Sequence, residues 1–395
     1  MRRGIAVGID IGTRQVKVLV AEKTDEIRGL PKIIGTGIAE SKGLRHGYII
    51  NSGDVTESIR SAVQQAESKS GFKIKRAFLS IGGVGLESAI GSGGAVVSRG
   101  DGEITEMDLE KVIEVARQNL PEGAILNRKI IQQVPLKFKI DGREVIGNRP
   151  IGMKGIKLDA RVLFITSLSQ HLDDMIEAVT DAGIEVEDVV PSPVAASLVS
   201  LTKTQKMVGS VLANIGGETV SIIVFENNLP ISLEVFPMGS TDITNDIALG
   251  LRVSLDEAES IKLGAITNAN YPKKKLEEIT VSRLSDIFEL IDAHLKKIGK
   301  SGMLPAGIVM TGGGSGLATI EDLAKAVLRL PSKTLVTSQN GEKEAIKDAY
   351  SSVAYGLCIS GLLGDGLTSE ESHPIKTAWR HFLKAIKDAL APLLP

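Results

Sequence analysis

The sequence is poor in cysteine and in aromatic residues. Its single cysteine, Cys358, cannot form a disulfide within the chain, and the Cys-x-x-Cys pairs of thiolate zinc sites are missing. Aromatic side chains make up only 3% of the 395 residues, and tryptophan occurs once, at Trp379. These absences exclude a disulfide scaffold and make the reducing cytosol the expected location.

Long apolar runs and an excess of one charge are also missing. No stretch approaches the roughly 18 consecutive apolar residues of a spanning helix. An alternating strand pattern, rather than a signal peptide, follows the first three residues. The formal net charge is −2, so whole-chain attraction to nucleic acid is not expected, and no nucleic-acid partner is predicted. With 43% hydrophobic residues, the chain can bury more than one core.

A strand, a glycine turn and a second strand occur twice in this sequence. The four strands are rich in β-branched residues and are predicted at 5–11, 16–20, 208–215 and 219–225. Gly12 lies at the first turn, and Gly216 and Gly217 lie at the second. A strand follows each turn, whereas a P-loop or Rossmann turn leads into a helix. This weak internal repeat predicts two related lobes.

A third glycine turn follows the predicted strand 307–310 and reads Thr311-Gly312-Gly313-Gly314-Ser315 at the start of a helix. Phosphate-binding loops need backbone N–H groups that face the ligand with no side chain in the way, which glycine allows. One glycine hairpin alone is more often a structural turn. The three turns together predict two phosphate clamps and a nucleoside-binding helix end.

Several polar side chains near these turns are candidate ligands. Asp10 precedes the first turn, where a carboxylate can hold the waters of a magnesium ion that bridges phosphates; a turn-capping aspartate is the alternative. Thr13 and Thr219 offer hydroxyls to phosphate oxygens, while Lys17 and Lys262 offer positive charge. Each of these four, taken alone, is more often a solvated surface residue.

The segment 83–159 interrupts the pattern of the first lobe. It contains a strand at 94–98, a capped helix at 105–119 and a long alternating strand at 129–140, after which the earlier pattern resumes. Later, residues 242–299 are mostly helical in pattern. The predicted organisation is a first-lobe core at 1–82 and 160–195, an inserted subdomain at 83–159, a second-lobe core at 196–241 and 305–363, a helical subdomain at 242–304, a linker at 364–374 and a terminal helix at 375–395.

The terminal segment has one apolar face and one basic face at helical spacing. The residues expected to contact a membrane are Trp379, Phe382, Leu383, Ile386, Leu390, Lys376, Arg380, Lys384 and Lys387. Such a helix can lie in the headgroup plane of an anionic membrane. A terminal helix packed on the core of the protein is the alternative. The polar linker and the one-sided basic stripe favour a helix that binds the membrane over one packed on the core.

At its glycine loops the sequence resembles the superfamily of actin, Hsp70 and sugar kinases, in which two lobes close on ATP. Within that superfamily it resembles the bacterial cell-division family FtsA, and the resemblance covers nearly the whole chain. The stretches that carry it are 8–13, 43–51, 151–155, 214–219, 244–248, 257–262 and 311–314.

The resemblance implies an α/β, actin-like, two-lobed fold with duplicated nucleotide-clamp domains, an FtsA-type inserted subdomain and a C-terminal amphipathic helix. It implies ATP and Mg²⁺ as cofactors, with Asp10 holding the metal through water. The implied nucleotide-binding residues are Asp10, Gly12, Thr13, Arg14, Gln15, Lys17, Asn214, Gly216, Gly217, Glu218, Thr219, Gly239, Glu259, Lys262, Gly312, Gly313, Gly314 and Ser315.

Three positions depart from the family pattern. Asn214 and Glu218 stand where the family usually has aspartate and glycine, and Gln15 stands where lysine is common. An amide cannot supply the negative charge that orders a metal and its waters, and Glu218 is expected to add a carboxylate close to the phosphates. No catalytic residue is therefore assigned. We expect ATP binding with weak or absent hydrolysis.

The function implied by the resemblance is an ATP-bound adaptor that polymerises and links FtsZ filaments to the cytoplasmic face of the cell membrane at the division site. Its partners would be the C-terminal tail of FtsZ, further copies of itself, the anionic membrane surface and other divisome proteins. The candidate FtsZ contacts are Lys273, Lys274, Lys275, Arg283 and Lys296. The alternatives are a small-molecule kinase of the same superfamily, which needs a base at the cleft, and a PilM-like pilus-assembly adaptor.

Overall fold

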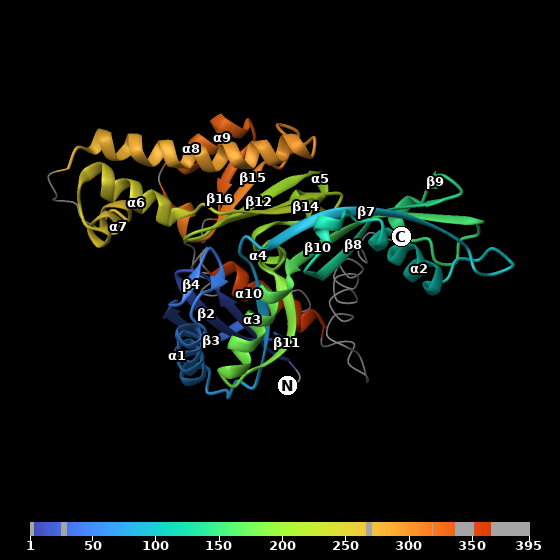
Figure 1. Ribbon diagram of the computed structural model, residues 1–395, viewed down its shortest axis with the longest axis horizontal. Coiled ribbons are helices and arrows are strands. Elements are labelled where there is room, and N and C mark those ends of the chain that lie inside the picture. Colours follow the sequence, from blue (N-terminus) through green and yellow to red (C-terminus); the bar gives the residue numbers. More distant parts are fainter. Residues whose placement is uncertain (1–3, 25–29, 266–270, 318, 336–350, 365–395) are drawn as a thin grey trace.

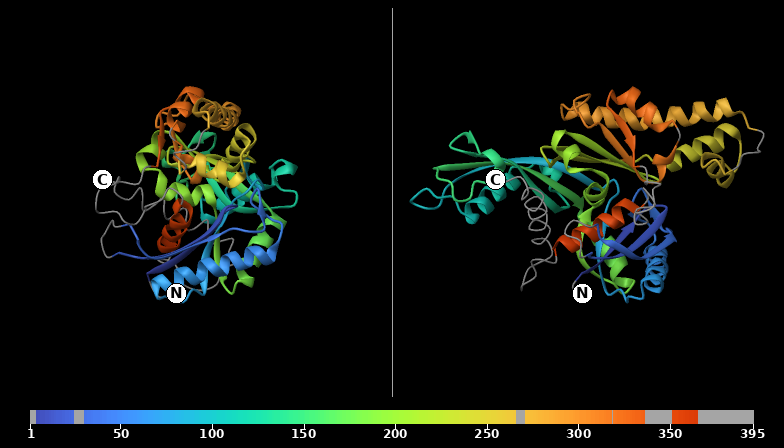
Figure 2. Two further views of the ribbon diagram at one scale, coloured as in Figure 1. Left: turned by 90° about the vertical axis from the view of Figure 1, so that its left-hand side faces the viewer. Right: turned by 180° about the vertical axis from the view of Figure 1, so that it is seen from behind.

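The protein consists of two stacked lobes and a third subdomain that projects to one side (Figures 1 and 2). The computed structural model describes residues 4–24, 30–265, 271–317, 319–335 and 351–364. The predicted terminal helix, and the predicted linker beyond Gly364, lie outside the described residues. No helix in the described ranges is long and apolar enough to cross a membrane.

The first lobe, which is lower in Figure 1, is built on a five-stranded sheet in the order β11-β6-β1-β2-β3. Its strands are β1 (Ile5–Ile11), β2 (Gln15–Glu22), β3 (Lys32–Glu40), β6 (Arg76–Ile81) and β11 (Glu185–Pro191). The first three form an antiparallel meander, and β6 and β11 continue the sheet in parallel with β1. A small hairpin, β4 (Leu44–Arg45) and β5 (Tyr48–Ile49), follows β3.

The second lobe repeats this topology. Its sheet has the order β14-β13-β12-β15-β16 and consists of β12 (Ser210–Ile215), β13 (Val220–Glu226), β14 (Leu229–Phe236), β15 (Ile308–Thr311) and β16 (Ser332–Thr334). Again an antiparallel meander comes first and two parallel strands complete the sheet. The duplication predicted from two hairpins is confirmed, and it extends to both whole sheets.

Apolar helix faces cover these sheets. The helices of the first lobe are α1 (Ser52–Ser70), α3 (Ser169–Asp181), α4 (Ser192–Ser200) and α10 (Ser352–Gly364). Those of the second lobe are α5 (Lys203–Val208), α6 (Ser240–Leu251), α7 (Leu255–Lys262), α8 (Lys273–Lys297) and α9 (Ile320–Leu328). The apolar residues that α8 buries in the second core are Leu284, Ile287, Phe288, Ile291 and Leu295.

Helix α10 packs on the first lobe, although residues up to 363 are predicted from the sequence to belong to the second. It contacts α4, β1 and β2, and the Tyr355 hydroxyl donates a hydrogen bond to the Pro31 carbonyl at 2.7 Å. A Cβ on Gly356 would lie 1.9 Å from the Ala195 carbonyl oxygen, so α10 and α4 cross in direct backbone contact. The chain therefore returns to its first lobe after building the second.

The inserted subdomain is a four-stranded sheet in the order β7-β10-β8-β9, with one face covered by α2 (Glu106–Gln118). Its strands are β7 (Leu86–Val96), β8 (Arg128–Ile140), β9 (Arg143–Glu144) and β10 (Lys157–Leu168). Strand β7 is longer than the predicted strand 94–98. The Ser88 hydroxyl on β7 donates to the Leu233 carbonyl of β14 and accepts from the Leu233 N–H, both at 2.8 Å. The insertion is therefore fastened to the second lobe as well as the first.

Candidate nucleotide-binding site

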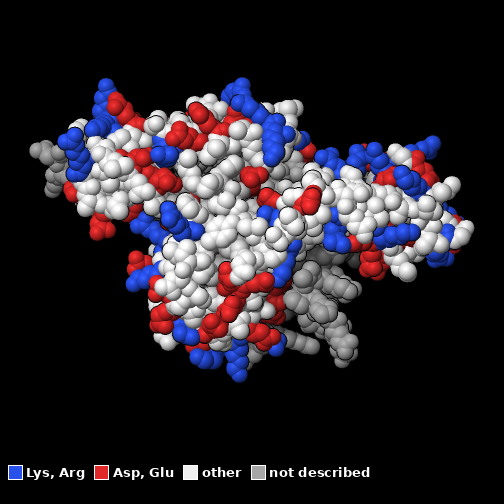
Figure 3. Space-filling view, in the orientation of Figure 1, with Lys and Arg blue, Asp and Glu red and all other residues white. Residues whose placement is uncertain are grey.

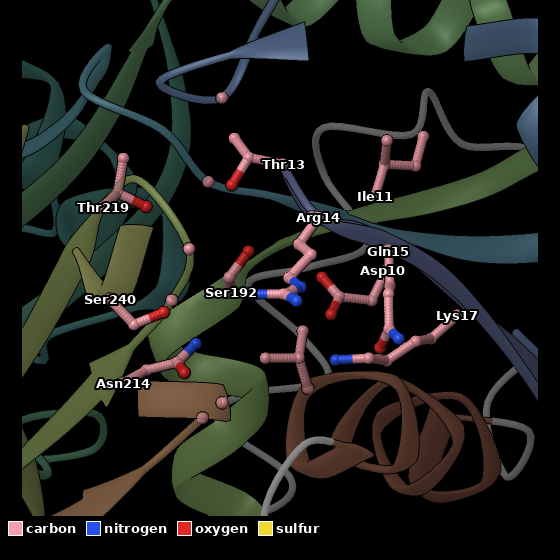
Figure 4. Close-up of a pocket in the computed structure, with 18 of the residues that line it drawn as sticks. Asp10, Ile11, Thr13, Arg14, Gln15, Lys17, Ser192, Asn214, Thr219 and Ser240 are labelled. Atoms are coloured by element: carbon pink, nitrogen blue, oxygen red, sulfur yellow. The ribbon is translucent and has the colours of Figure 1, made fainter. Parts of the chain in front are cut away.

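A cavity of about 440 Å³ lies between the lobes, where the two glycine turns face each other (Figure 4). This volume is within the range of about 300 to 1,000 Å³ that is typical of small-molecule sites. Asp10, Gln15 and Lys17 line one side of the cavity, and Asn214 and residues near it line the opposite side. Both halves of the duplicated fold therefore contribute to one site.

The first turn joins β1 to β2. The Gly12 N–H donates to the Gln15 carbonyl at 3.1 Å and closes the turn. Asp10 lies opposite Lys17 in the strand register and accepts a 2.8 Å hydrogen bond from the Ser80 hydroxyl. Burial raises the pKa of the Asp10 carboxyl, although Lys17 and Ser80 act in the other direction. The turn therefore presents a carboxylate and a cation side by side.

The second turn joins β12 to β13 in the same way. The Gly216 N–H donates to the Thr219 carbonyl at 2.9 Å, and Asn214 lies opposite Ser221. All four residues line the cavity. The pair at the end of these strands is therefore neutral, in contrast to the charged pair of the first turn.

The two turns almost touch. A Cβ on Gly217 would lie 3.1 Å from the Thr13 hydroxyl oxygen, and a Cβ on Gly239 would lie 2.3 Å from the Gly217 carbonyl oxygen. Gly239 itself lies behind the turn and does not line the cavity. A side chain at Gly217 would therefore press on the first turn, and a side chain at Gly239 would collide with the backbone of the second turn itself.

Helix α7 adds a charged cluster to the wall of the cavity. Glu259 contacts Arg14 of the opposite lobe at 2.5 Å, Lys262 at 2.8 Å and the Thr244 hydroxyl at 2.6 Å. Lys262 also donates to the Ser240 carbonyl at 3.0 Å. Burial raises the pKa of Glu259, but the hydrogen bonds from Lys262 and Thr244 outweigh burial and lower that pKa overall. Glu259 is therefore ionised, and its carboxylate is held by Arg14, Lys262 and Thr244.

The third glycine turn borders the cavity through Gly312 and Gly313. Gly312 has φ +88°, and a Cβ there would lie 2.3 Å from the Asn214 side-chain oxygen. Gly314 and Ser315 are buried behind it, and the Ser315 hydroxyl donates to the Gly312 carbonyl at 2.8 Å. This turn therefore supports the cavity mainly through its backbone.

The structure brings most of the predicted site residues together. The predicted residues that line the cavity are Asp10, Gly12, Thr13, Arg14, Gln15, Lys17, Asn214, Gly216, Gly217, Thr219, Glu259, Lys262, Gly312 and Gly313. Glu218 is not among them, because its carboxylate accepts a 2.5 Å hydrogen bond from the His46 N–H of the first lobe. The expectation that Glu218 places a carboxylate beside the phosphates is therefore corrected.

Sequence reasoning missed part of the lining. The additional residues are Ile11, Ile38, Gly47, Gly82, Gly83, Met175, Ser192, Ser221, Ser240, Leu263 and Val353. Gly82 and Gly83 follow β6 directly, so a glycine pair after a strand was a usable signal. Ser192 and Ser240 begin helices in unremarkable sequence, and no local pattern marks them.

The candidate FtsZ contacts do not form one patch. Arg283 pairs with Asp246 at 2.6 Å, and Lys296 pairs with Asp292 at 2.7 Å. The three lysines at 273–275 are exposed at the first turn of α8, whereas Lys296 is near its last residue. At about 1.5 Å per helical residue, these groups are some 30 Å apart.

The duplicated sheets, with a cavity between their hairpin turns, define an actin-like two-lobed protein. Solved structures show the same fold. A PilM–PilN type IV pilus biogenesis complex matches with a TM-score of 0.68 and 15% identity over 91% of this chain and 99% of that chain. MreB 5 of Spiroplasma citri bound to AMPPNP matches with a TM-score of 0.50 and 12% identity over 100% of both chains. At these identities the likeness shows the fold alone.

Sequence comparisons identify the family. The family model for cell division protein FtsA matches residues 211–356, and that for the SHS2 domain inserted in FtsA matches residues 86–166. Cell division protein FtsA of Pseudomonas aeruginosa is 30% identical over 93% of this chain and 92% of its own length. The Borreliella burgdorferi protein of that name is 32% identical over 91% of both. The chain belongs to the FtsA family of cell division proteins, which confirms the resemblance seen in its motifs.

Proposed function

We propose that this protein is an ATP-binding adaptor of bacterial cell division that polymerises and tethers FtsZ filaments to the inner face of the cytoplasmic membrane. The observation that carries the proposal is the interlobe cavity, in which two glycine turns and the α7 cluster converge. Family membership supplies the cellular context.

The residues that line the cavity fit a nucleoside triphosphate with magnesium. Gly12, Gly216 and Gly217 line the cavity without side chains that would exclude phosphates, and Arg14 and Lys17 line the same space with positive charge. No group of three or more His, Cys, Asp or Glu side chains that could hold a metal occurs among the described residues. A magnesium ion would therefore rely on Asp10, through water, and on the oxygens of the phosphates.

Hydrolysis is expected to be slow. Among the described residues, the carboxylates that line the cavity are Asp10 and Glu259, and the latter is engaged by Arg14 and Lys262. Asn214, at the position equivalent to Asp10, supplies an amide. Because an amide cannot order an attacking water by charge or accept its proton, binding is favoured over turnover.

A kinase function has less support. A kinase needs a base aimed at a second substrate, and Asp10, the remaining cavity carboxylate in the described part of the chain, already accepts a hydrogen bond from Ser80. The pilus-assembly alternative rests on a likeness of fold alone.

Membrane attachment is assigned to residues 375–395 on their sequence pattern. Each large apolar side chain that is fully buried contributes about 1.5 to 3 kcal/mol, and each basic residue near an anionic leaflet about 1 kcal/mol. On the face shown in Figure 3, acidic side chains gather over α3 of the first lobe. An anionic membrane would repel that region, so we expect another face to lie toward the lipid.

Vesicle sedimentation tests the adaptor function. With ATP present, the full chain should sediment with vesicles containing phosphatidylglycerol and carry FtsZ filaments with it. A chain truncated after Glu371 should stay in the supernatant. The matched control is Lys384→Glu with Lys387→Glu, which keeps the apolar face and should weaken binding to anionic but not neutral vesicles. If the full and truncated chains behave alike, the tethering function is wrong.

A further inference from the structure

The two glycine turns each place one charged residue at the same position. The bonds from Gly12 N–H to Gln15 O and from Gly216 N–H to Thr219 O close equivalent turns at 3.1 and 2.9 Å. In each turn, the residue before the accepting carbonyl is charged: Arg14 in the first and Glu218 in the second. The duplicated fold therefore gives these two residues matching places on opposite sides of the cleft.

Both residues reach across to the other lobe. Arg14 pairs with Glu259 of α7 at 2.5 Å. Glu218 accepts a 2.5 Å hydrogen bond from the His46 N–H, and its own carbonyl lies 3.3 Å from His46 Nδ1. The two contacts therefore form a pair of bridges across the cleft, and in both the first lobe donates the hydrogen bond and the second lobe accepts it.

His46 is held in a conformation that suits this contact. Its φ is +49°, in the left-handed region, and Gly47 follows with φ +89°. A Cβ on Gly47 would lie 2.5 Å from the Gly83 Cα, so this loop is pressed against the turn after β6. The packing fixes the direction of the His46 N–H, which a flexible loop would not do.

The two bridges differ in their relation to the cavity. Arg14 and Glu259 both line it, so a bound ligand would compete with their contact. Glu218 and His46 do not line it, whereas their neighbours Gly217 and Gly47 do. The second bridge therefore lies directly behind the cavity wall. There it can hold the lining residues in place around a ligand without being displaced by that ligand.

We propose that Glu218 and His46 form an interlobe latch that positions the second glycine turn over the bound nucleotide and slows its release. The inference rests on the proposed nucleotide binding. The two are positioning residues, because neither faces the cavity. The latch should act on dissociation rather than association, since it holds an already closed cleft together.

Release kinetics test the latch. The probe is mant-ATP with Mg²⁺, chased with excess ATP. Glu218→Gly should speed release about tenfold, which corresponds to about 1.4 kcal/mol, with little change in the association rate. Glu218→Gln keeps an acceptor oxygen without the charge and should speed release less, by about threefold. The control is Glu226→Gln, a carboxylate of the same lobe that pairs with Lys300 at 2.6 Å and should leave release unchanged.

A covalent version of the latch provides a second measurement. His46→Cys combined with Glu218→Cys, joined by a short bismaleimide, should release mant-ATP more slowly than the same variant before cross-linking. Burial raises the pKa of the native Cys358 thiol to about 12, so it should not react. Unaltered release in Glu218→Gly and in the cross-linked protein would overturn the latch alone. A failure of the unmodified chain to bind mant-ATP would overturn the nucleotide-binding function itself.

Discussion

The two hairpin turns occupy the same place in their sheets but differ in chemistry. In the first, Asp10 lies opposite Lys17, whereas in the second the equivalent Asn214 lies opposite Ser221. The backbone hydrogen bonds that close the turns are the same. Duplication has therefore preserved the backbone that closes the turn, whereas the charged side chains with which these hairpins line the cavity, Asp10, Arg14 and Lys17, all belong to the first copy.

This difference assigns cation binding and phosphate binding to different turns, whereas in a symmetrical site both turns would have to do both. Under the proposed function, the carboxylate of the first turn would hold the hydrated cation, and the glycines of the second turn would let its backbone approach the phosphates. A second carboxylate across the cleft would add repulsion toward phosphate. The asymmetry therefore favours holding ATP over cleaving it, and the following variants test that view.

The largest effect is expected from removing the Asp10 carboxylate of the first turn. Asp10→Asn keeps the shape but loses the carboxylate that would hold the hydrated magnesium, so binding of ATP with Mg²⁺ should weaken by about 100-fold. Titration calorimetry with and without Mg²⁺ measures this. Asp322→Asn, on the exposed surface of α9, is the control and should bind normally. Equal affinities for Asp10→Asn and the unmodified chain would show that the first turn does not hold the metal.

Giving the second turn a carboxylate like that of the first should raise the rate of ATP hydrolysis. Asn214→Asp restores a second carboxylate, and we expect ATP hydrolysis to increase about tenfold, equivalent to about 1.4 kcal/mol of activation free energy. Phosphate release measures the rate. Asn228→Asp, in the turn that joins β13 to β14, should leave the rate unchanged. Rapid hydrolysis by the unmodified chain would contradict the role given to Asn214.

A smaller effect is expected on the pH dependence of stability. Burial raises the pKa of Asp10, so the folded chain takes up this proton at a higher pH than the unfolded chain does. The ionised carboxylate then destabilises the nucleotide-free fold at neutral pH, and this cost disappears as the pH falls through the raised pKa. Asp10→Asn should therefore raise the melting temperature at neutral pH by about 2 °C, with the gain shrinking on acidification. A lower melting temperature at every pH would refute this assignment.

The smallest effect is expected from the bridge inside the cavity. The Arg14 side chain is 53% exposed, so its pair with Glu259 should contribute less than about 1 kcal/mol to the stability of the nucleotide-free chain. Arg14→Ala should therefore change urea unfolding only slightly, and the change should diminish at high salt. A loss of several kcal/mol would place this contact among the main supports of the fold.

Local patterns in the sequence were enough to predict the hairpins and their turns. Alternating β-branched residues and glycines fix β1, β2, β12 and β13 over short distances, and the apolar spacing on α8 fixes its buried face. Because the glycine turns are the parts of the cavity formed by neighbours in sequence, their contribution to the site was also predictable.

Long-range packing explains what the sequence did not reveal. Helix α10 follows the second lobe in the chain but buries Tyr355 and Cys358 against the first, and nothing within the helix encodes that choice of partner. The direction of Glu218 likewise depends on His46, which is 172 positions away. Ser192 enters the cavity lining for the same reason, because the two lobes meet only after folding.

The double attachment of the inserted subdomain constrains how the cleft can open. Its strands leave and rejoin the first lobe, while Ser88 holds Leu233 on the edge of the second. A rotation of one lobe against the other must therefore either shear these hydrogen bonds or turn the insertion as a lever arm. In the second case, a small change in angle at the cleft becomes a much larger displacement at the far end of the arm.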